Sequence, residues 1–266
     1  MTYGFKSHLP HQKHLQMQVL FFYPFFSQEL LMKKILLAGY GWFASIPEGQ
    51  TNNAELIARA LDKTILRAEN GEEAEIVSLI VPVIWKEAFA PVEAAIRDNK
   101  PDLVLALGTD ARACAMRPEP YGVNWKRGKD AAKDGSVTDM NEAILPGGEL
   151  FLRGTLPFEE MTLAMLRAGI PAQLGALSDA EEGAPVSKKS TTGLYLCNYM
   201  AYRLAHLAKD IPGLQTGFMH VPTQPEYACA QRLSQDPPAL DAPMYASMPL
   251  EMMIRGTKEA LRACIK

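Results

Sequence analysis

The chain has 266 residues, of which 48% are hydrophobic and 21% are charged, a balance typical of soluble globular proteins. Its net charge of −3 and its lack of a dense run of Lys and Arg argue against nucleic acid as the main partner. The length allows either one large domain or two small ones.

The first 31 residues differ in pattern from everything that follows. Their longest apolar run, residues 19–26, is far shorter than the ~20 residues needed to cross a bilayer, so no membrane association is expected. Pro24 interrupts this run, which argues against the core of a signal peptide. Met32 stands directly before a convincing first strand. We therefore expect residues 1–31 to be a disordered or non-native extension and residues 32–266 to form a single domain.

From Met32 onward, predicted strands and helices alternate. Strands are predicted over residues 35–39, 75–83, 103–108, 170–174, 194–196 and 217–222. Helices are predicted over residues 52–61, 86–98, 158–168, 197–208 and 250–265, the first of them capped by Asn52 or Asn53. This alternation indicates an α/β fold, a three-layer α/β/α sandwich around a largely parallel twisted sheet. Residues 126–150 are expected to form a long surface loop, and residues 177–190 a mobile insertion.

Cys197 stands where an apolar run gives way to the periodic pattern of an amphipathic helix. Backbone N–H groups and the positive end of the helix dipole favour a thiolate there, and the thiolate is the nucleophilic form. The alternative is that Cys197 is a small buried apolar residue. The other cysteines, Cys114, Cys229 and Cys264, are expected to be packing residues. Because no CxxC pair occurs, neither a zinc site nor a disulfide framework is expected, and a cytoplasmic location is predicted.

A thiol nucleophile needs a base and a third group that orients the base. His220 ends a predicted strand and could turn toward Cys197, the alternative being a half-buried strand histidine. Glu119 lies between two prolines in the predicted loop after strand 103–108 and could orient the base, the alternative being a solvated charge. Arg112 and Arg117 in the same loop could partner Glu119 or form an anion site. These segments follow predicted strand ends, which indicates one active site at the carboxyl edge of the sheet.

Several short segments resemble motifs of the pyroglutamyl-peptidase I (pyrrolidone-carboxylate peptidase) family of cysteine peptidases. They include residues 118–124 (PEPYGVN), 154–157 (GTLP), 169–172 (GIPA), 193–199 (GLYLCNY), 217–222 (GFMHVP) and 247–251 (SMPLE). They occur in the family's order, and the resemblance extends from about Lys34 to the C-terminus. Each motif is short, but this many in register form a specific signal.

The resemblance implies a catalytic triad of Cys197, His220 and Glu119 as nucleophile, base and orienting carboxylate. The implied reaction is hydrolysis of the amide bond after an N-terminal pyroglutamate, through a thioester acyl-enzyme. The implied partners are peptides that begin with pyroglutamate. No metal or organic cofactor is implied, and a homo-oligomer, either dimer or tetramer, is expected because family members often self-associate.

The resemblance also implies a pocket for the pyroglutamyl ring. Tyr40 and Phe43 stand at its aromatic positions, and Thr109 stands at its backbone position. A flat, uncharged lactam suits aromatic walls with one amide donor and one acceptor. Residues 39–44 differ from the family's loop pattern, and the insertion at 177–190 precedes the nucleophile motif. Two alternatives follow: a pyroglutamyl-peptide binding protein with little or no turnover, and an amidase for another small lactam or acyl amide.

Overall fold

The computed structural model describes residues 1–2, 4, 32–43, 46, 49–130, 134–235, 237–238, 240–241, 243–244 and 246–265. The chain divides into two units, Met1–Leu31 and Met32–Lys266, and every described helix and strand lies in the second. The predicted extension lies outside the described residues, apart from residues 1, 2 and 4. No helix in the described ranges combines the length and apolar character that a membrane span requires.

A central sheet forms the middle layer of the unit Met32–Lys266. In the described residues it has six strands, β1 (Lys33–Tyr40), β2 (Ile65–Arg67), β3 (Glu73–Val81), β4 (Leu103–Thr109), β5 (Arg117–Glu119) and β12 (Gln215–Val221). Their spatial order is β2-β3-β1-β4-β12-β5. The four inner strands are parallel, whereas the edge strands β2 and β5 run antiparallel to their neighbours. The predicted α/β class and largely parallel sheet are confirmed.

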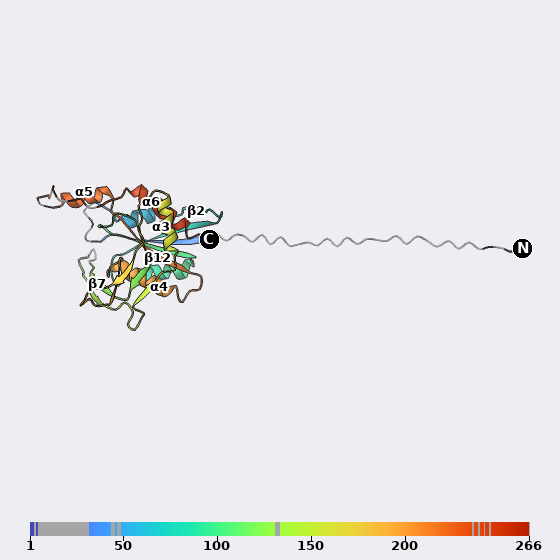
Figure 1. The fold of residues 1–266 in the computed structure, drawn as a ribbon, viewed down its shortest axis with the longest axis horizontal. Helices are drawn as coiled ribbons and strands as arrows, with labels where there is room; N and C mark the ends of the chain where they lie inside the picture. The colour runs from blue at the N-terminus through green and yellow to red at the C-terminus, as the bar shows by residue number, and fades with distance from the viewer. Residues whose placement is uncertain are drawn as a thin grey trace. The chain divides into compact units, whose positions relative to one another are not determined.

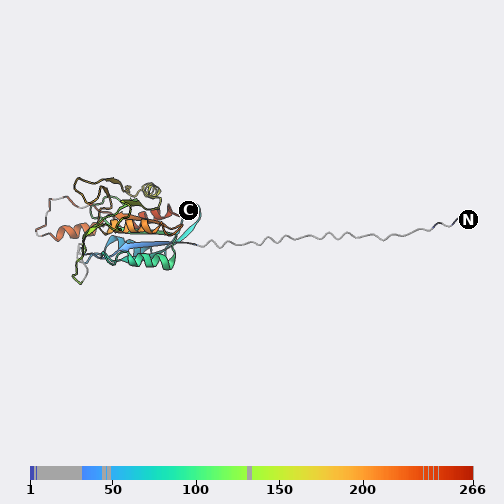
Figure 2. The ribbon, with the colours of Figure 1, turned by 90° about the horizontal axis from the view of Figure 1, so that it is seen from below.

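Helices cover both faces of the sheet. They are α1 (Asn53–Leu61), α2 (Ala90–Asn99), α3 (Phe158–Arg167), α4 (Leu196–Leu207), α5 (Pro225–Leu233) and α6 (Leu250–Arg262). Both α1 and α3 pack against α6, and Figure 1 shows α3 and α6 on the opposite side of the sheet from α4. The view from below shows the face where α2 and α4 lie against the strands (Figure 2). The result is the expected three-layer sandwich.

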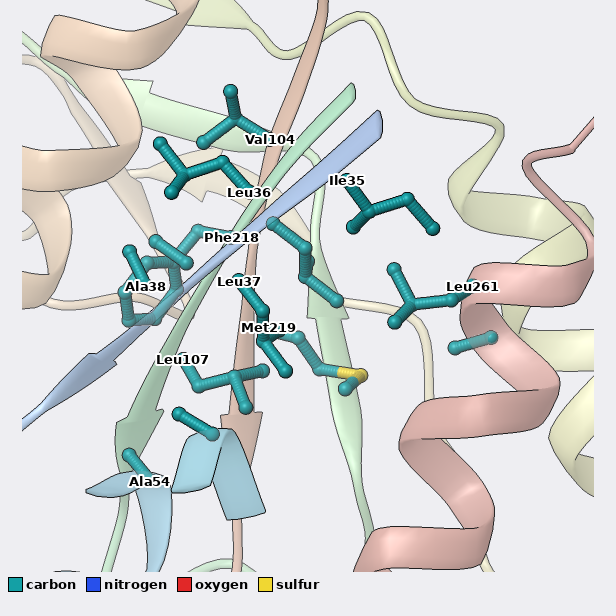
Figure 3. Packing of buried hydrophobic residues seen from close by; sticks show 14 of the residues in the cluster. Ile35, Leu36, Leu37, Ala38, Ala54, Val104, Leu107, Phe218, Met219 and Leu261 are labelled. Carbon is teal, nitrogen blue, oxygen red and sulfur yellow. The ribbon is translucent and has the colours of Figure 1, made fainter. Parts of the chain in front are cut away.

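The core lies on both sides of β1. Ile35 and Leu37 point toward Leu261 of α6, whereas Leu36 and Ala38 point to the opposite side (Figure 3). Successive side chains of a strand alternate between the two faces of a sheet, so a strand covered by helices on both faces is apolar throughout. This explains the continuous apolar runs in β1 and β4, and it fixes both strands in the middle of the sandwich.

Short strand pairs flank the sheet. They are β6 (Tyr121–Val123) with β9 (Phe151–Arg153), β7 (Lys126–Lys129) with β8 (Asp139–Glu142), and β10 (Leu177–Asp179) with β11 (Lys188–Ser190). The prediction of a loop over residues 126–150 is therefore wrong where β7 and β8 form. Opposite charges face each other across this pair, with Lys126 Nζ 2.9 Å from Glu142 Oε1, and such cross-strand pairs stabilise a polar hairpin. Residues 177–190 contain the β10–β11 pair, and their mobility stays a prediction.

Two predicted strands are wrong. Residues 170–174 contribute only an isolated bridge, between Met116 and Ala172. Residues 194–196 hold no strand, because the chain turns at Gly193 (φ +78°) and α4 begins at Leu196. An apolar run of three residues fits the start of a buried helix as well as it fits a strand. The helix predicted from residue 86 begins later, as α2, with Pro91 in its first turn, where a missing N–H costs no hydrogen bond.

Candidate active site

Three parallel strands end at one edge of the sheet, and α4 begins at the same place. Gly108 near the end of β4 is paired with His220 of β12. A Cβ atom on Gly108 would lie 2.9 Å from Cys197 Sγ and 3.6 Å from His220 Cδ2. The carboxyl edge of the sheet therefore brings the thiol and the imidazole together around one glycine.

Cys197 occupies the second position of α4 and is half-buried. The residues on both sides of it are held by hydrogen bonds. The Tyr40 hydroxyl donates to the Leu196 carbonyl at 2.7 Å. The fully buried Asn198 side chain makes three hydrogen bonds, each 2.8 Å, to the backbone of Val123 and Trp125. These contacts hold the first turn of α4 in place.

The first turn of α4 also presents unsatisfied donors. N–H groups in the first turn of a helix have no acceptor within the helix, and the Tyr195 side chain makes no capping hydrogen bond to them. The Cys197 sulfur therefore stands beside backbone N–H groups and at the positive end of the helix dipole.

His220 contacts Glu119 through its Nδ1 atom, which lies 2.8 Å from Glu119 Oε1. The other carboxylate oxygen accepts a hydrogen bond from the Thr191 hydroxyl. His220 is 4% exposed and Glu119 is 2% exposed, so the pair is shielded from water. The Phe218 ring packs edge-on against the imidazole, with ring centroids 5.0 Å apart. The predicted loop position of Glu119 is wrong, because Glu119 ends β5, the edge strand beside β12, where Pro118 is tolerated.

Burial and hydrogen bonding act in opposite directions on this pair. Burial lowers the pKa of His220, but the charge of Cys197, the hydrogen bond to Cys197 and the contact with Glu119 outweigh burial and raise it to about 10. Burial likewise raises the pKa of Glu119, yet the hydrogen bonds and charge of His220, with those from Thr191 and Arg117, bring the pKa below its usual range. The arrangement thus favours an imidazolium held between the Cys197 sulfur and the Glu119 carboxylate.

Arg117 connects the buried Glu119 carboxylate to Asp110, which is less buried. Its Nε atom donates to Glu119 Oε1 at 2.7 Å, and its Nη2 atom donates to Asp110 Oδ2 at 2.8 Å. Nη2 also lies 3.4 Å from His220 Nδ1. The Arg117 side chain is only 15% exposed, so the guanidinium is a largely buried part of the site. Of the two arginines that the sequence suggests as partners of Glu119, Arg117 makes the contact, whereas the Arg112 side chain is 89% exposed and pairs with Asp110.

Two cavities meet at Cys197. The smaller has a volume of about 100 Å³ and is lined by Tyr40, Phe43, Val83, Thr109, Tyr195 and neighbouring residues. The larger is more open, has a volume of about 450 Å³ and reaches from Cys197 and His220 to Tyr227 and Gln231 of α5. Phe43, Thr109 and Tyr195 border both. The sulfur therefore lies between a small aromatic pocket and a wider groove.

All three predicted pocket residues line the small cavity. Thr109 is tied to the start of α1, since its hydroxyl donates to Asn52 Oδ1 at 2.6 Å. The Asn52 side chain also caps α1, by accepting from the Ala54 N–H, and donates to the Gly41 carbonyl at 2.8 Å. Asn52 thereby links the loop after β1, the helix α1 and the end of β4 around the small cavity.

Some residues of the site are not apparent in the sequence. Thr191 follows the β10–β11 pair, and nothing in its local pattern indicates a contact with Glu119. Asn198 offers a weak signal, as a polar residue on the apolar side of a predicted helix next to the candidate nucleophile. Cys264 is buried as expected, but Cys114 and Cys229 are exposed, so their predicted packing role is wrong. Within the described residues, no group of three or more His, Cys, Asp or Glu side chains is arranged to hold a metal ion.

A family model of pyroglutamyl peptidases matches residues 33–266 of the sequence. The chain belongs to the pyroglutamyl peptidase family. Within this family, the pyrrolidone-carboxylate peptidase of Vibrio vulnificus (strain CMCP6) is 28% identical over 237 residues, which cover 88% of this chain and 94% of the relative. That of Lactobacillus johnsonii is 30% identical over 196 residues, which cover 73% of this chain and 78% of the relative.

Among solved structures, the pyrrolidone carboxyl peptidase from Thermococcus litoralis is similar with a TM-score of 0.70 and 26% sequence identity. The match covers 88% of this chain and 93% of the other. The predicted family, its fold class and its assignment as a hydrolytic enzyme are confirmed.

Proposed function

We propose that this protein is a cysteine peptidase that removes pyroglutamate from the N-terminus of peptides, using Cys197, His220 and Glu119 as a triad. The observation that supports this most strongly is the packing of the thiol and the imidazole around Gly108, with Glu119 Oε1 2.8 Å from His220 Nδ1. A nucleophile, a base and a group that orients the base are the three parts that acyl transfer by a thiol requires.

The reaction begins with attack by the Cys197 sulfur on the carbonyl that joins pyroglutamate to the next residue. His220 Nδ1 faces Glu119, which leaves Nε2 as the ring nitrogen that exchanges a proton with the thiol and the leaving amine. Glu119 fixes the ring orientation and stabilises the imidazolium. Collapse of the tetrahedral intermediate then releases the peptide amine and leaves a thioester on Cys197. Water, deprotonated by His220, hydrolyses the thioester and releases pyroglutamate.

The start of α4 supplies the donors for the oxyanion. Because first-turn N–H groups lack acceptors within the helix, the backbone N–H of Cys197 and its neighbours are free to bind the developing negative charge. The Tyr40 and Asn198 hydrogen bonds hold these donors in place before substrate arrives. Donors that are already oriented lower the barrier without reorganisation during the reaction.

The small cavity fits the pyroglutamyl ring. Its aromatic lining from Tyr40, Phe43 and Tyr195 suits a flat, uncharged lactam, and a charged N-terminal amine would have to lose its hydration there. The wider groove on the other side of Cys197 is open enough to take the rest of the peptide. This division assigns selectivity for the first residue to the small cavity and tolerance of the following residues to the groove.

Hydrolysis of pyroglutamyl-aminocoumarin tests the proposal. We expect the wild-type protein to cleave it and to leave glutamyl- and glutaminyl-aminocoumarin essentially untouched. Cys197→Ser should lower kcat by about 10³-fold or more, because a serine hydroxyl is intrinsically a much weaker nucleophile than a cysteine thiol. The matched control is Cys114→Ser, which alters an exposed cysteine and should leave the rate unchanged.

Two results would count against the proposal. Tight binding of a pyroglutamyl peptide by the wild-type protein without any cleavage would favour a binding protein. Faster cleavage of another acyl amide or lactam than of the pyroglutamyl substrate would favour a different amidase. The cytoplasmic location and the dimeric or tetrameric state stay predictions, and light scattering on the purified protein would test the second of them.

A further inference from the structure

Arg117 lies directly opposite His220 on the neighbouring strand. In the antiparallel pairing of β5 with β12, His220 faces Arg117 and Phe218 faces Glu119. Like charges directly opposite each other on a sheet are destabilising. A buried arginine therefore stands where it opposes protonation of the histidine.

The contacts of Arg117 suggest a reason for this arrangement. Arg117 Nε at 2.7 Å and His220 Nδ1 at 2.8 Å both bind the same oxygen of Glu119. The charge of that carboxylate is thus shared between two cations. Thr191 holds the other oxygen, and Asp110 balances the far end of the guanidinium. Glu119 is consequently held from three sides, of which only one is the imidazole.

Resting on the proposed function, we propose that Arg117 is a positioning residue that keeps Glu119 oriented and limits how firmly His220 retains its proton. In the tetrahedral intermediate, the His220 Nε2 proton passes to the amide nitrogen. The C–N bond then breaks with its electron pair on that nitrogen, and the thioester carbonyl re-forms. His220 becomes neutral in this step, so Glu119 loses one of its two cations. Arg117 remains as partner of the 2% exposed carboxylate, which removes part of the cost of giving up the proton.

The charged groups around His220 determine the direction in which each substitution should shift the pKa of His220. Cys197 of α4, Glu119 of β5 and Asp110 after β4 are acidic groups that favour the imidazolium, whereas Arg117 opposes it. Tyr40 of β1 faces Cys197, and burial followed by the charge of Cys197 raises its pKa well above its usual value, so it stays neutral. Removal of Arg117 should therefore strengthen the hold of His220 on its proton, and removal of the Asp110 charge should weaken it.

The test compares two leaving groups in the full-length protein. A pyroglutamyl peptide amide needs its leaving nitrogen protonated, whereas pyroglutamyl p-nitrophenyl ester releases a stable phenolate without a proton. For Arg117→Met we expect the ratio of kcat/KM for the amide to kcat/KM for the ester to fall by about threefold or more, because a weaker acid donates its proton more slowly. In the pH profile of kcat/KM for the amide, the fall at high pH (the alkaline limb) reports deprotonation of His220, and in Arg117→Met it should move to higher pH. Asp110→Asn should move that limb to lower pH.

A matched control is Arg97→Met, which removes a surface arginine paired with Glu93 and should change neither the ratio nor the limb. An equal fall for amide and ester in Arg117→Met, with the limb unmoved or shifted downward, would overturn the proposal and leave Arg117 a structural role. If Arg117→Met does not fold, Arg117→Gln serves as the second variant, because it removes the charge but keeps a side chain that can donate to Glu119. An unchanged amide-to-ester ratio with an unmoved limb in that variant would overturn the proposal. Failure of the wild-type protein to cleave either substrate would instead overturn the proposed function.

Discussion

Gly108 leaves the space that the sulfur of Cys197 occupies. A Cβ atom there would come 2.7 Å from Phe218 Cζ and 2.9 Å from Cys197 Sγ, distances at which one of the neighbours must shift. The edge-on contact of Phe218 with the imidazole means that a shift of the phenylalanine would also disturb His220. The absence of a side chain at Gly108 therefore keeps the Cys197 thiol and the His220 imidazole correctly placed relative to each other.

Gly108→Ala should accordingly lower kcat/KM by about 10²-fold, since a displacement of about 1 Å of a reacting group has this effect. The fold should survive, and a circular dichroism melt beside the kinetic assay would check it. Gly147→Ala is the control. It introduces a side chain where φ is +73° and no atom lies within 4 Å, so it should cost about 1 kcal/mol of stability without loss of activity. A fully active Gly108→Ala variant would show that Cys197 is not confined as described.

The protonation of His220 sets the pH range of the reaction. Because its pKa is raised to about 10, the imidazolium persists up to about that pH, and the fall of kcat/KM on the alkaline side (the alkaline limb) should begin there. Glu119→Gln removes one of the groups that raise the pKa, so the alkaline limb should move to lower pH. This variant should also lose less activity than Cys197→Ser. A limb that stays in place or moves upward in Glu119→Gln would contradict the assigned contact.

At the scale of the element, α4 carries the nucleophile and is fixed at its first turn. The Asn198 side chain replaces the missing backbone partners of β6 and the residues that follow it, so the helix docks through hydrogen bonds as well as apolar packing. Such a buried amide has little freedom to move, because the buried Val123 N–H would lose the acceptor that Asn198 provides.

Asn198→Ala should lower the free energy of unfolding by about 1–3 kcal/mol, since it leaves the buried Val123 N–H without its acceptor. Urea denaturation would measure the change. Asn99→Ala, which removes an exposed side-chain hydrogen bond at the end of α2, should change stability by less than about 0.5 kcal/mol. Equal effects of the two substitutions would mean that Asn198 does not anchor the helix.

Sequence patterns predicted some elements and missed others for identifiable reasons. The predicted capping choice at Asn52 or Asn53 and the apolar period up to Leu61 located α1 almost to the residue, because both signals are local. The strand β5 was missed because it has three residues and contains Pro118, which is acceptable only at a sheet edge. The contact of Thr191 with Glu119 joins residues 72 positions apart, and no local pattern encodes it.

At the scale of the whole unit Met32–Lys266, the parallel sheet explains why distant residues meet. The ends of β1, β4 and β12 lie at one edge, and they bring Tyr40, Thr109 and His220 beside the start of α4. This convergence was predictable, since parallel strands joined by helices must end together. The contacts that hold the Glu119 carboxylate were not predictable from the sequence. They depend on the register of the edge strand β5 and on Thr191, which follows the β10–β11 pair.

The central claim is that Cys197 carries the acyl group during hydrolysis, and rapid-quench mass spectrometry tests it most directly. The wild-type protein would be mixed with pyroglutamyl p-nitrophenyl ester, quenched in acid within the first turnover and digested for peptide mapping. We predict a pyroglutamyl group attached to the peptide that contains Cys197, and none on the peptides that contain Cys114, Cys229 or Cys264. Complete hydrolysis without a pyroglutamyl adduct on Cys197, and with undiminished turnover in Cys197→Ser, would contradict the account.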